Sequence, residues 1–415
     1  MLGYRKRSFG RAHDLLTTLR NDQNNLAALR EMQALLLGEI ILTEERIRPL
    51  KMELKTIDPD APDADLKRFV FLTNRIEGLR RCAFIWRCFG DAIAFLYMDK
   101  YALKQTLYNT DNYNAKQSAG FIGGKDGLRT ELAVLDSFVD ARIPALLVDI
   151  TNTIRHGDIC VMAGPDPMLV EVKASKKKLN PRGRKQTRSL EMLNTFFTTD
   201  RAKGLRGMEE VRRRGSRVAE RDHVDLMNMC IGKAREYGYG IEQPEKGLFY
   251  VAMGDDAPTI QEIFADMGLR EPLVFGWNIE KSQQTWVPFV PFTLTIEDKD
   301  ALWDFIQGKL FVMVVLEIDR LKEIAAEIGL NAAYDEQSDP SYPLKFELVG
   351  GAGLSDISRQ MISRIGMECV SPETIIQRAA EMYANSAEEF SAEKEQQESA
   401  SVTFAGSFEV RPTTN

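Results

Sequence analysis

The stretch that decides the fold of the central region is GDICVMAGPDPMLVEVKAS, residues 157–175. Its two apolar runs, DICVMA (158–163) and MLVEVKA (168–174), have the length and the valine, leucine and isoleucine content of strands. GPDP (164–167) has the composition of a turn, so the two runs predict a β-hairpin. An earlier apolar run, ALLVDI (145–150), predicts a further strand.

Acidic residues and a lysine lie at the ends of these predicted strands. Side chains alternate along a strand, so Glu171 and Lys173 share one face. A turn in the middle of GPDP would place Asp158 opposite Lys173 and diagonal to Glu171. The helical stretch LRTELAVLDSFVDA (128–141) adds Glu131 upstream.

Converging carboxylates form an all-oxygen site, which suits Mg²⁺ or Mn²⁺. A lysine beside such a metal supplies the positive charge that positions and deprotonates an attacking water. The metal also stabilises the charge on a phosphoryl group. These residue types therefore predict the hydrolysis of phosphodiester bonds.

The arrangement resembles the PD-(D/E)xK nuclease superfamily, which has the restriction-endonuclease-like fold. The resemblance covers roughly residues 120–200 and includes a glutamine in RGRKQTR, where several subfamilies have one. It implies the catalytic residues Glu131, Asp158, Glu171, Lys173 and Gln186. It implies as metal ligands Asp158, Glu171, Glu131 and the carbonyl of Val172.

The chain departs from the family motif at one position, because Asp158 follows Gly157 and not a proline. A literal Pro165-Asp166 lies in the turn, too close to Glu171 to come from a neighbouring strand. Asp158 is therefore the expected ligand.

Other signals near the site are weaker. GFIGGKDG (120–127) resembles a phosphate-binding loop but lacks the spacing and the Ser or Thr of a P-loop, so we interpret it as a lead-in to the Glu131 helix. His156 is interpreted as an exposed loop histidine, with contact to a metal or phosphate as the alternative. Cys160 is expected to be a small core residue rather than a nucleophile.

Positive charge is concentrated in one segment, although the whole chain carries a net charge of −7. Residues 173–235 contain eighteen Lys or Arg and only seven Asp or Glu. Beside a metal site, such residues would bind a phosphate backbone without reading its sequence, and a solvated basic surface is the alternative. The expected nucleic-acid-binding residues are Lys176, Lys177, Lys178, Arg182, Arg184, Lys185, Arg188, Arg212, Arg213 and Arg214. Residues 185–235 are heavily charged and are predicted to be helical.

The N-terminal region predicts two long helices. Apolar residues at helical spacing predict one helix over residues 11–54, which Pro49 should end or bend. The loop DPDAPDAD (58–65) follows, and a second helix starts near Asp65. The helices form a hairpin that packs within the chain or against another copy. Because paired nuclease sites make double-strand breaks, we expect a dimer or higher homo-oligomer with this hairpin in its interface.

The predicted fold class is α+β or α/β in four parts. We expect a coiled-coil-like helical hairpin (1–115), a restriction-endonuclease-like core with the basic segment (116–245), an α/β domain (246–386) and a disordered tail (387–415). The α/β domain has four predicted strands, LFYVAM, PLVFGW, FVPFTLTI and LFVMVVLEI, and a helix that begins at SPE (371–373).

Composition excludes several classes of protein. With 415 residues and 44% hydrophobic residues, the chain can bury a substantial core. Charges interrupt every apolar run before the ~18 residues of a membrane span, so no membrane partner is expected. Five cysteines without a C-x-x-C pair predict free thiols in a reducing cytoplasm and no zinc cluster.

These observations predict a cytoplasmic nuclease that depends on Mg²⁺ or Mn²⁺ and cuts DNA, most simply as an endonuclease. Family analogy alone adds a bacterial or phage setting such as antiviral defence. A further hypothesis is that the helical hairpin makes the protein an assembly subunit whose cleavage is switched on by a partner protein. The alternative is a catalytically idle nucleic-acid-binding or scaffold subunit that retains the nuclease fold.

Overall fold

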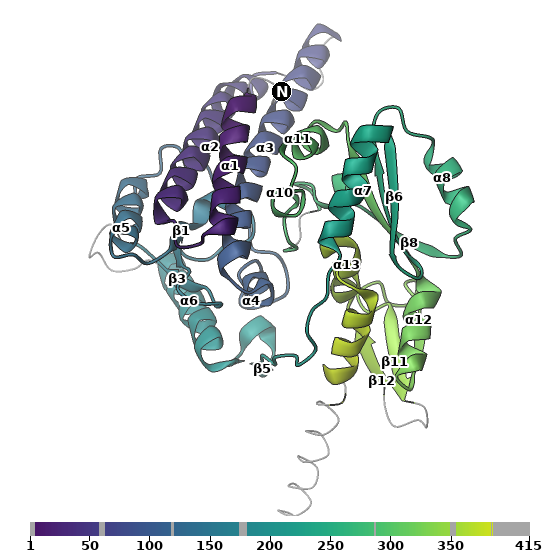
Figure 1. Ribbon diagram of the computed structural model, residues 1–415. Coiled ribbons are helices and arrows are strands. Elements are labelled where there is room, and N and C mark those ends of the chain that lie inside the picture. The colour runs from purple at the N-terminus through teal and green to yellow at the C-terminus, as the bar shows by residue number, and fades with distance from the viewer. Residues whose placement is uncertain are drawn as a thin grey trace, which may run out of the picture.

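The fold combines long N-terminal helices with small antiparallel sheets (Figure 1), which confirms the mixed α+β class. The computed structural model describes residues 5–57, 63–117, 120–173, 181–285, 288–348, 354–382 and 384. No helix within these ranges is long and apolar enough to cross a membrane.

The predicted first helix is divided into α1 (Lys6–Asn21) and α2 (Leu26–Leu54). The expectation of one continuous helix is wrong because the side chain of Asn25 caps α2, accepting a hydrogen bond of 3.0 Å from the Ala28 amide. Pro49 lies inside α2 and does not end it. Packing of Ile47 in a small apolar cluster with α3 helps to hold these last turns.

The second predicted helix is α3 (Asp63–Tyr97), which pairs with α2 as a helical hairpin. Residues 58–62 of the expected loop lie outside the described residues, and 63–65 belong to the helix. The apolar stripe of α2 is fully buried at Leu29 and Leu36, in the same core cluster as α3. The hairpin therefore packs within the chain, and this stripe offers no surface to a second copy.

The central sheet contains β1 (Ala145–Leu147), β2 (Ile159–Val161) and β3 (Met168–Val170), all antiparallel, in this order. This confirms the predicted hairpin, but residues Val148–Ile150 form a 3-10 turn rather than strand. In the register, Ile159 pairs with Val170, so the next position brings Asp158 nearest Glu171.

The expected pairing of Asp158 with Lys173 is therefore wrong by two residues. The chain turns earlier than assumed, since Val161 and Met168 are the last paired residues before the turn. A shift of two residues preserves the alternation of side chains. Asp158 and Glu171 consequently stay on one face of the sheet.

Helix α5 (Leu128–Asp140) precedes β1 and confirms the predicted Glu131 helix. Helix α6 (Pro181–Thr199) follows β3 and packs against it. The prediction of helix beyond residue 199 is wrong up to α7 (Val224–Tyr237). β4 (Arg201–Lys203) and β5 (Glu210–Arg212) form a hairpin there. Gly204 and Gly207 both have positive φ and interrupt any helix.

The C-terminal part contains an antiparallel four-stranded sheet in the order β6-β7-β9-β8. Three of its strands were predicted: β7 (Leu248–Met253), β8 (Pro272–Gly276) and β9 (Phe311–Glu317). The strand expected at FVPFTLTI is wrong. That stretch contains the helical turn α10 (Phe292–Thr295), and its proline, Pro291, removes a ladder donor.

The remaining elements complete the C-terminal part. A second antiparallel sheet contains β10 (Leu330–Tyr334), β11 (Leu344–Leu348) and β12 (Leu354–Ile357). A helix over 372–382 follows Ser371, as SPE predicts, and the expected tail at 387–415 lies outside the described residues. The other elements are α4 (Lys100–Gln105), β6 (Tyr239–Glu245), α8 (Ile260–Met267), α9 (Trp277–Glu280), α11 (Lys299–Gln307), α12 (Ile318–Glu327) and α13 (Arg359–Glu368).

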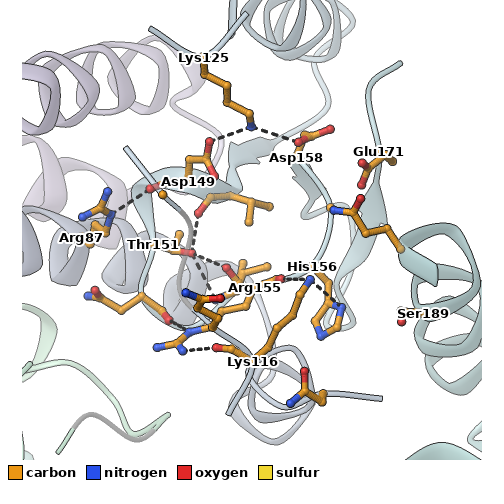
Figure 2. A pocket seen from close by; sticks show the side chains of 18 of the residues that line it. Arg87, Lys116, Lys125, Asp149, Thr151, Arg155, His156, Asp158, Glu171 and Ser189 are labelled. Atoms are coloured by element: carbon orange, nitrogen blue, oxygen red, sulfur yellow. Dashed lines mark hydrogen bonds and ion pairs between the residues drawn. The ribbon is translucent and has the colours of Figure 1, made fainter. Parts of the chain in front are cut away.

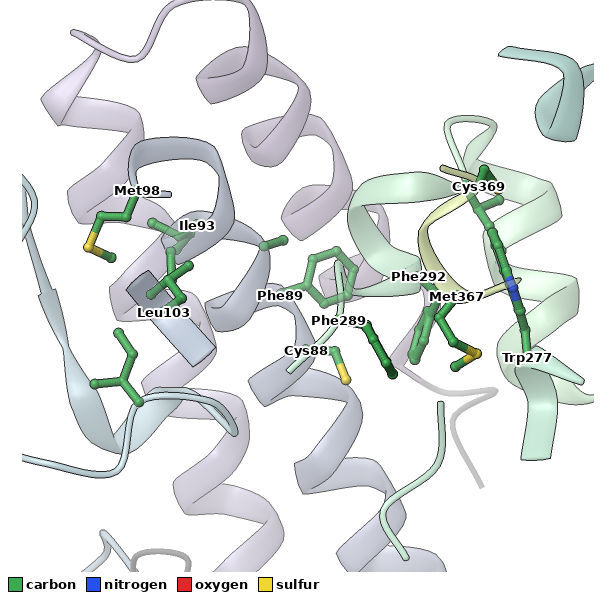
Figure 3. Packing of buried hydrophobic residues seen from close by; sticks show 14 of the residues in the cluster. Cys88, Phe89, Ile93, Met98, Leu103, Trp277, Phe289, Phe292, Met367 and Cys369 are labelled. Carbon is green, nitrogen blue, oxygen red and sulfur yellow. The ribbon is translucent and has the colours of Figure 1, made fainter. Parts of the chain in front are cut away.

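Helix α3 packs against the C-terminal part through aromatic residues. Phe89 and Cys88 of α3 face Phe289 and Phe292 (Figure 3). The Thr293 hydroxyl donates a 2.8 Å hydrogen bond to the Cys88 carbonyl. These contacts belong to one continuous cluster of buried residues that runs from α1 to the helix over 372–382. The helical hairpin is thus joined both to the central sheet and to the C-terminal part.

We predict that Gly90→Ala lowers the free energy of unfolding by about 1–3 kcal/mol, because the added methyl group would clash with a closely packed backbone segment. A Cβ at Gly90 would lie 2.0 Å from the Ile150 carbonyl oxygen, where α3 meets the 3-10 turn after β1. Urea unfolding measures the change. Gly38→Ala in α2 is the control, since a Cβ there meets nothing within 4 Å and alanine favours a helix. Equal stability of the two variants would contradict the proposed contact.

Candidate functional site

Three carboxylates converge on one lysine at the end of the central sheet. The Lys125 Nζ atom lies 3.0 Å from Glu131 Oε1, 3.0 Å from Asp149 Oδ2 and 3.3 Å from Asp158 Oδ1. Figure 2 shows Lys125 between Asp149 and Asp158. The four residues come from the 120–127 loop, α5, the 3-10 turn after β1 and the start of β2. The cluster unites two of the predicted carboxylates with two residues that were not predicted.

Asp158 is held by the backbone of the neighbouring strand. Its amide donates a 2.8 Å hydrogen bond to the Val170 carbonyl, and its Oδ2 accepts one of 2.9 Å from the Val172 amide. Gly157 before it has a φ of +77°, and a Cβ there would lie 2.9 Å from the Val170 oxygen. Glycine at 157 therefore allows the close approach of β2 and β3. Val172 contacts the site through its N–H, whereas the resemblance implies a role for its carbonyl.

Glu171 and Gln186 line the same cavity as Asp158 and Lys125, Gln186 from α6. In Figure 2, Glu171 lies on the side of Asp158 that faces α6. Lys173 is exposed and is not among the described residues that line the cavity. The sequence therefore located Glu131, Asp158 and Glu171 but not Asp149, and the lysine next to these carboxylates is Lys125 and not Lys173.

The loop that carries Lys125 is anchored to α2. Glu44, 1% exposed, accepts hydrogen bonds of 2.8 and 2.9 Å from the amides of Ile122 and Gly123. The Arg48 guanidinium donates to the Gly123 carbonyl. The interpretation of GFIGGKDG as a lead-in to the Glu131 helix is right about its position, but it overlooks that the loop delivers a site residue.

The segment around Asp149 is anchored to α3. The buried carboxylate of Asp91 accepts hydrogen bonds of 3.0 and 2.8 Å from the amides of Asn152 and Thr153. Arg87 Nε donates to the Asp149 carbonyl at 3.1 Å. Burial raises the pKa of Asp91 to about 6, against the lowering effect of these hydrogen bonds. Both helices of the hairpin thus use buried polar side chains to position the site backbone.

The cluster lies in a cavity of about 900 Å³. Its described lining residues include the carboxylates of Asp111, Asp149, Asp158 and Glu171, and the amide of Gln186 and the hydroxyl of Ser189 from α6, whereas Glu131 lies behind the wall. Cationic side chains are numerous around them: Arg80, Arg87, Lys116, Lys125, Arg155 and Lys185. A cavity with an acidic cluster and many cations suits a ligand that is itself anionic and approaches a bound cation.

The charges of the cluster influence one another. Burial raises the pKa of Glu131, and the Lys125 ammonium opposes this. Burial also raises the pKa of Glu171, with the charge of Asp158 as the next cause. Burial tends to lower the pKa of Lys125, but the charge and hydrogen bond of Asp149 outweigh it and raise that pKa. Lys125 therefore remains an ammonium that balances the carboxylates.

His156 is buried, so its interpretation as an exposed loop histidine is wrong. Its Nε2 lies 2.9 Å from the Tyr108 carbonyl and its Nδ1 lies 3.4 Å from Lys116 Nζ. A carbonyl accepts and an ammonium donates, so these partners fit the neutral tautomer protonated on Nε2. Burial, followed by the charge of Lys116, lowers the pKa of His156 to about 4. Cys160 is a buried core residue, as expected, and burial raises its pKa to about 12.

Only part of the basic segment lies at the cavity. Lys176, Lys177 and Lys178 fall outside the described residues, as does the side chain of Arg182. Arg184, Lys185 and Arg188 are exposed on α6, where Lys185 lines the cavity and lies 3.3 Å from Asp111.

The three consecutive arginines lie at and just after β5. Arg212 pairs with Glu210 at 2.6 Å, and Arg214 is exposed. Arg213 has a structural contact, since it binds Asp166 in the β2–β3 turn and Asp200 after α6. Asp166 is thus engaged away from the cluster, in agreement with the choice of Asp158 as the site aspartate.

The donor types at the cluster fit a hard divalent cation, because all of them are carboxylate oxygens. The Lys125 ammonium among them shows that the carboxylates can surround a compact positive charge. Within the described ranges, however, no three His, Cys, Asp or Glu side chains are grouped so that they could hold a metal ion. A metal would need Lys125 and the carboxylates to rearrange.

Comparisons of the chain with protein-family models, with curated proteins and with solved structures find no match.

Sequence reasoning missed Asp149 and Lys125. Asp149 had a signal, since it is an ionisable residue inside the apolar run ALLVDI and must find a partner if buried. Lys125 follows two glycines, a position that allows a side chain to approach a site, but this signal is weak. Their contacts join residues 24 and 33 positions apart, which no local pattern specifies.

We predict that the neutral, buried His156 makes folding sensitive to acid. Its pKa is about 4 in the folded protein against 6.5 for an ordinary histidine, so the unfolded chain binds the extra proton between these values. The contribution of His156 to stability is fully present above pH 6.5 and falls as the pH decreases towards 4. The loss at pH 4.5 is on the order of 2–3 kcal/mol.

Urea unfolding at pH 7 and pH 4.5 tests this prediction. His156→Gln retains an N–H donor for the Tyr108 carbonyl but does not titrate. The free energy of unfolding of wild type should therefore fall more steeply with acid than that of the variant. The same pH dependence in both proteins would show that burial does not hold His156 neutral.

Proposed function

We propose that this protein is a divalent-metal-dependent nuclease whose active site is the cavity around Asp149, Asp158 and Glu171. The observation that carries the proposal is the convergence of three carboxylates on Lys125, in a cavity with several further cations. The resemblance of the sequence over roughly residues 120–200 to the PD-(D/E)xK motif favours the same assignment. DNA is the proposed substrate on that resemblance.

In this proposal the cavity cations bind the phosphate backbone. Lys116, Arg155 and Lys185 supply positive charge at the wall, and Gln186 and Ser189 supply polar groups from α6. Such contacts hold any nucleic acid irrespective of sequence. They leave the scissile phosphate close to the carboxylates.

The carboxylates would hold Mg²⁺ or Mn²⁺, with Asp149 added to the expected set of Asp158, Glu171 and Glu131. When bound, the ion polarises the phosphoryl oxygen and lowers the pKa of a water. The described residues orient the reactants. Lys125 neutralises the carboxylates before substrate arrives, and its ammonium then positions the attacking water. We assign this role to Lys125 instead of Lys173, because only Lys125 contacts the carboxylates among the described contacts.

The idle alternative also has an observation in its favour. A lysine already balances the carboxylates, and such a site is stable without a metal. A protein of this kind would bind nucleic acid without cutting it. Cleavage assays separate the two functions, because binding alone leaves the substrate intact.

We expect purified protein to cut DNA with Mg²⁺ or Mn²⁺ and not with EDTA. Supercoiled, linear and single-stranded DNA and RNA serve as substrates, and gel analysis identifies the products. Asp149→Asn and Asp158→Asn should each reduce cleavage by at least about 100-fold, since each removes a charged ligand. Asp136→Asn is the matched control, because this exposed aspartate of α5 pairs with Arg30 away from the cavity.

Binding without cleavage under every metal condition would refute the nuclease proposal and support the idle alternative. Cleavage that Asp149→Asn leaves unchanged would remove Asp149 from the site.

We also predict that Lys125→Met loses most of the activity while Lys173→Met retains most of it. Methionine preserves length and removes the charge at either position. Rates of DNA cleavage under single-turnover conditions measure the effect of each substitution, and circular dichroism confirms that both variants fold. The reverse order of rates would restore Lys173 as the catalytic lysine that the family motif implies.

A further inference from the structure

A buried lysine without an ion-pair partner among the described residues lies at a second cavity. Lys281, after α9, is 4% exposed. Its Nζ donates a 3.0 Å hydrogen bond to the Val290 carbonyl and lies 3.9 Å from the centroid of the Trp277 ring. Among the described residues, no carboxylate forms a salt bridge with it. Within the described part of the chain, the direct contacts of this buried ammonium are therefore one carbonyl and one indole face.

The carboxylate that acts on Lys281 at longer range is already engaged. Glu368 lies 2.8 Å from Lys100 Nζ and 2.6 Å from an Arg364 nitrogen, and it accepts a hydrogen bond from the Val290 amide. Lys100 also pairs with Glu220, which binds Arg378 as well, so three cations share two carboxylates and neither carboxylate pairs with Lys281. Burial lowers the pKa of Lys281 to about 8, so the amine is still mainly protonated at pH 7.

The cavity beside Lys281 has a volume of about 570 Å³, within the range of small-molecule sites. One part of its wall is apolar, and the described residues there are Phe84, Ile85, Ile279, Phe292, Phe305 and Ile306. Lys281 and Arg81 bring positive charge, and Gln283 and Gln284 bring amides. The wall also carries the carboxylate of Glu77, which is paired with Arg80. An apolar wall with a few polar groups is the usual composition of a ligand pocket.

We propose that this cavity binds a small molecule that has an anionic oxygen group, phosphate or carboxylate, on an apolar ring. The anionic group would pair with Lys281 and the ring would pack against Phe305 and Phe292. An unpaired buried charge is costly, and a ligand anion removes that cost when it binds. A cavity that required only an apolar guest would not need a buried cation in its wall.

The position of the cavity connects it with the proposed active site. Phe84 and Gln283 line both cavities, so they form a shared wall. A ligand in the second cavity would therefore contact residues that also line the first cavity. The binding proposal itself rests on Lys281 and stands whether or not the first cavity hydrolyses nucleic acid.

Isothermal titration of the full chain at pH 7 tests the proposal with four probes. Phenyl phosphate and benzoate combine a ring with an anion, whereas inorganic phosphate lacks the ring and benzyl alcohol lacks the charge. We expect phenyl phosphate, benzoate or both to bind saturably and more tightly than the two partial probes. Comparison of the first two identifies the anionic group.

Lys281→Met should weaken binding of the anionic probe roughly 30-fold, as expected for loss of one partner of a buried charge pair. Lys309→Met is the matched control, since Lys309 is exposed and is not among the described lining residues. The Lys281 variant should be at least as stable as wild type in urea, because it removes a buried charge. No saturable binding, equal binding to the Lys281 variant, or equal affinity for inorganic and phenyl phosphate would overturn the proposal.

Discussion

The ion cluster around Lys125 is the constraint on which the organisation of the central region depends. Glu131, Asp149 and Asp158 bring negative charge together from three separate segments, and repulsion would drive them apart without a cation between them. Each segment is fixed in turn by hydrogen bonds from its backbone. The fold must therefore hold these groups at close range while it leaves Lys125, Asp149 and Asp158 at the wall of a cavity.

The helical hairpin meets this requirement through buried polar side chains. Gln33 of α2 bonds with the Ala145 carbonyl and the Leu147 amide of β1 at 3.0 and 2.9 Å, and Glu44 holds the Lys125 loop. Asp91 of α3 holds the segment after Asp149. A buried polar group without a partner is costly, so these contacts specify one arrangement of the backbone. The hairpin is thus a scaffold of the site as well as an apolar core.

The sequence predicted the local part of this site well. The β2–β3 hairpin places Asp158 near Glu171 because side-chain alternation survives an error of two residues in register. Helix α5 with Glu131 follows from its own periodicity. The ends of the N-terminal helices were predicted less well. Pro49 does not end α2, because packing outweighs one lost hydrogen bond. A short turn before α2, capped by Asn25, divides the helix that was expected to be continuous.

What the sequence could not specify is the meeting of distant charges. Lys125 and Asp149 belong to a loop and to the end of an apolar run, and only the packed structure brings them into contact. The same holds for Lys281, whose isolation is a property of all the elements around it. A charge pattern reports how many cations a segment has, but their partners decide their role. Arg213 lies in a run of three arginines and is held by two aspartates, whereas Lys125 and Lys281, outside the basic segment, lie at the cavities. In such a chain, the pairing of the charges rather than their number therefore determines where a site can form.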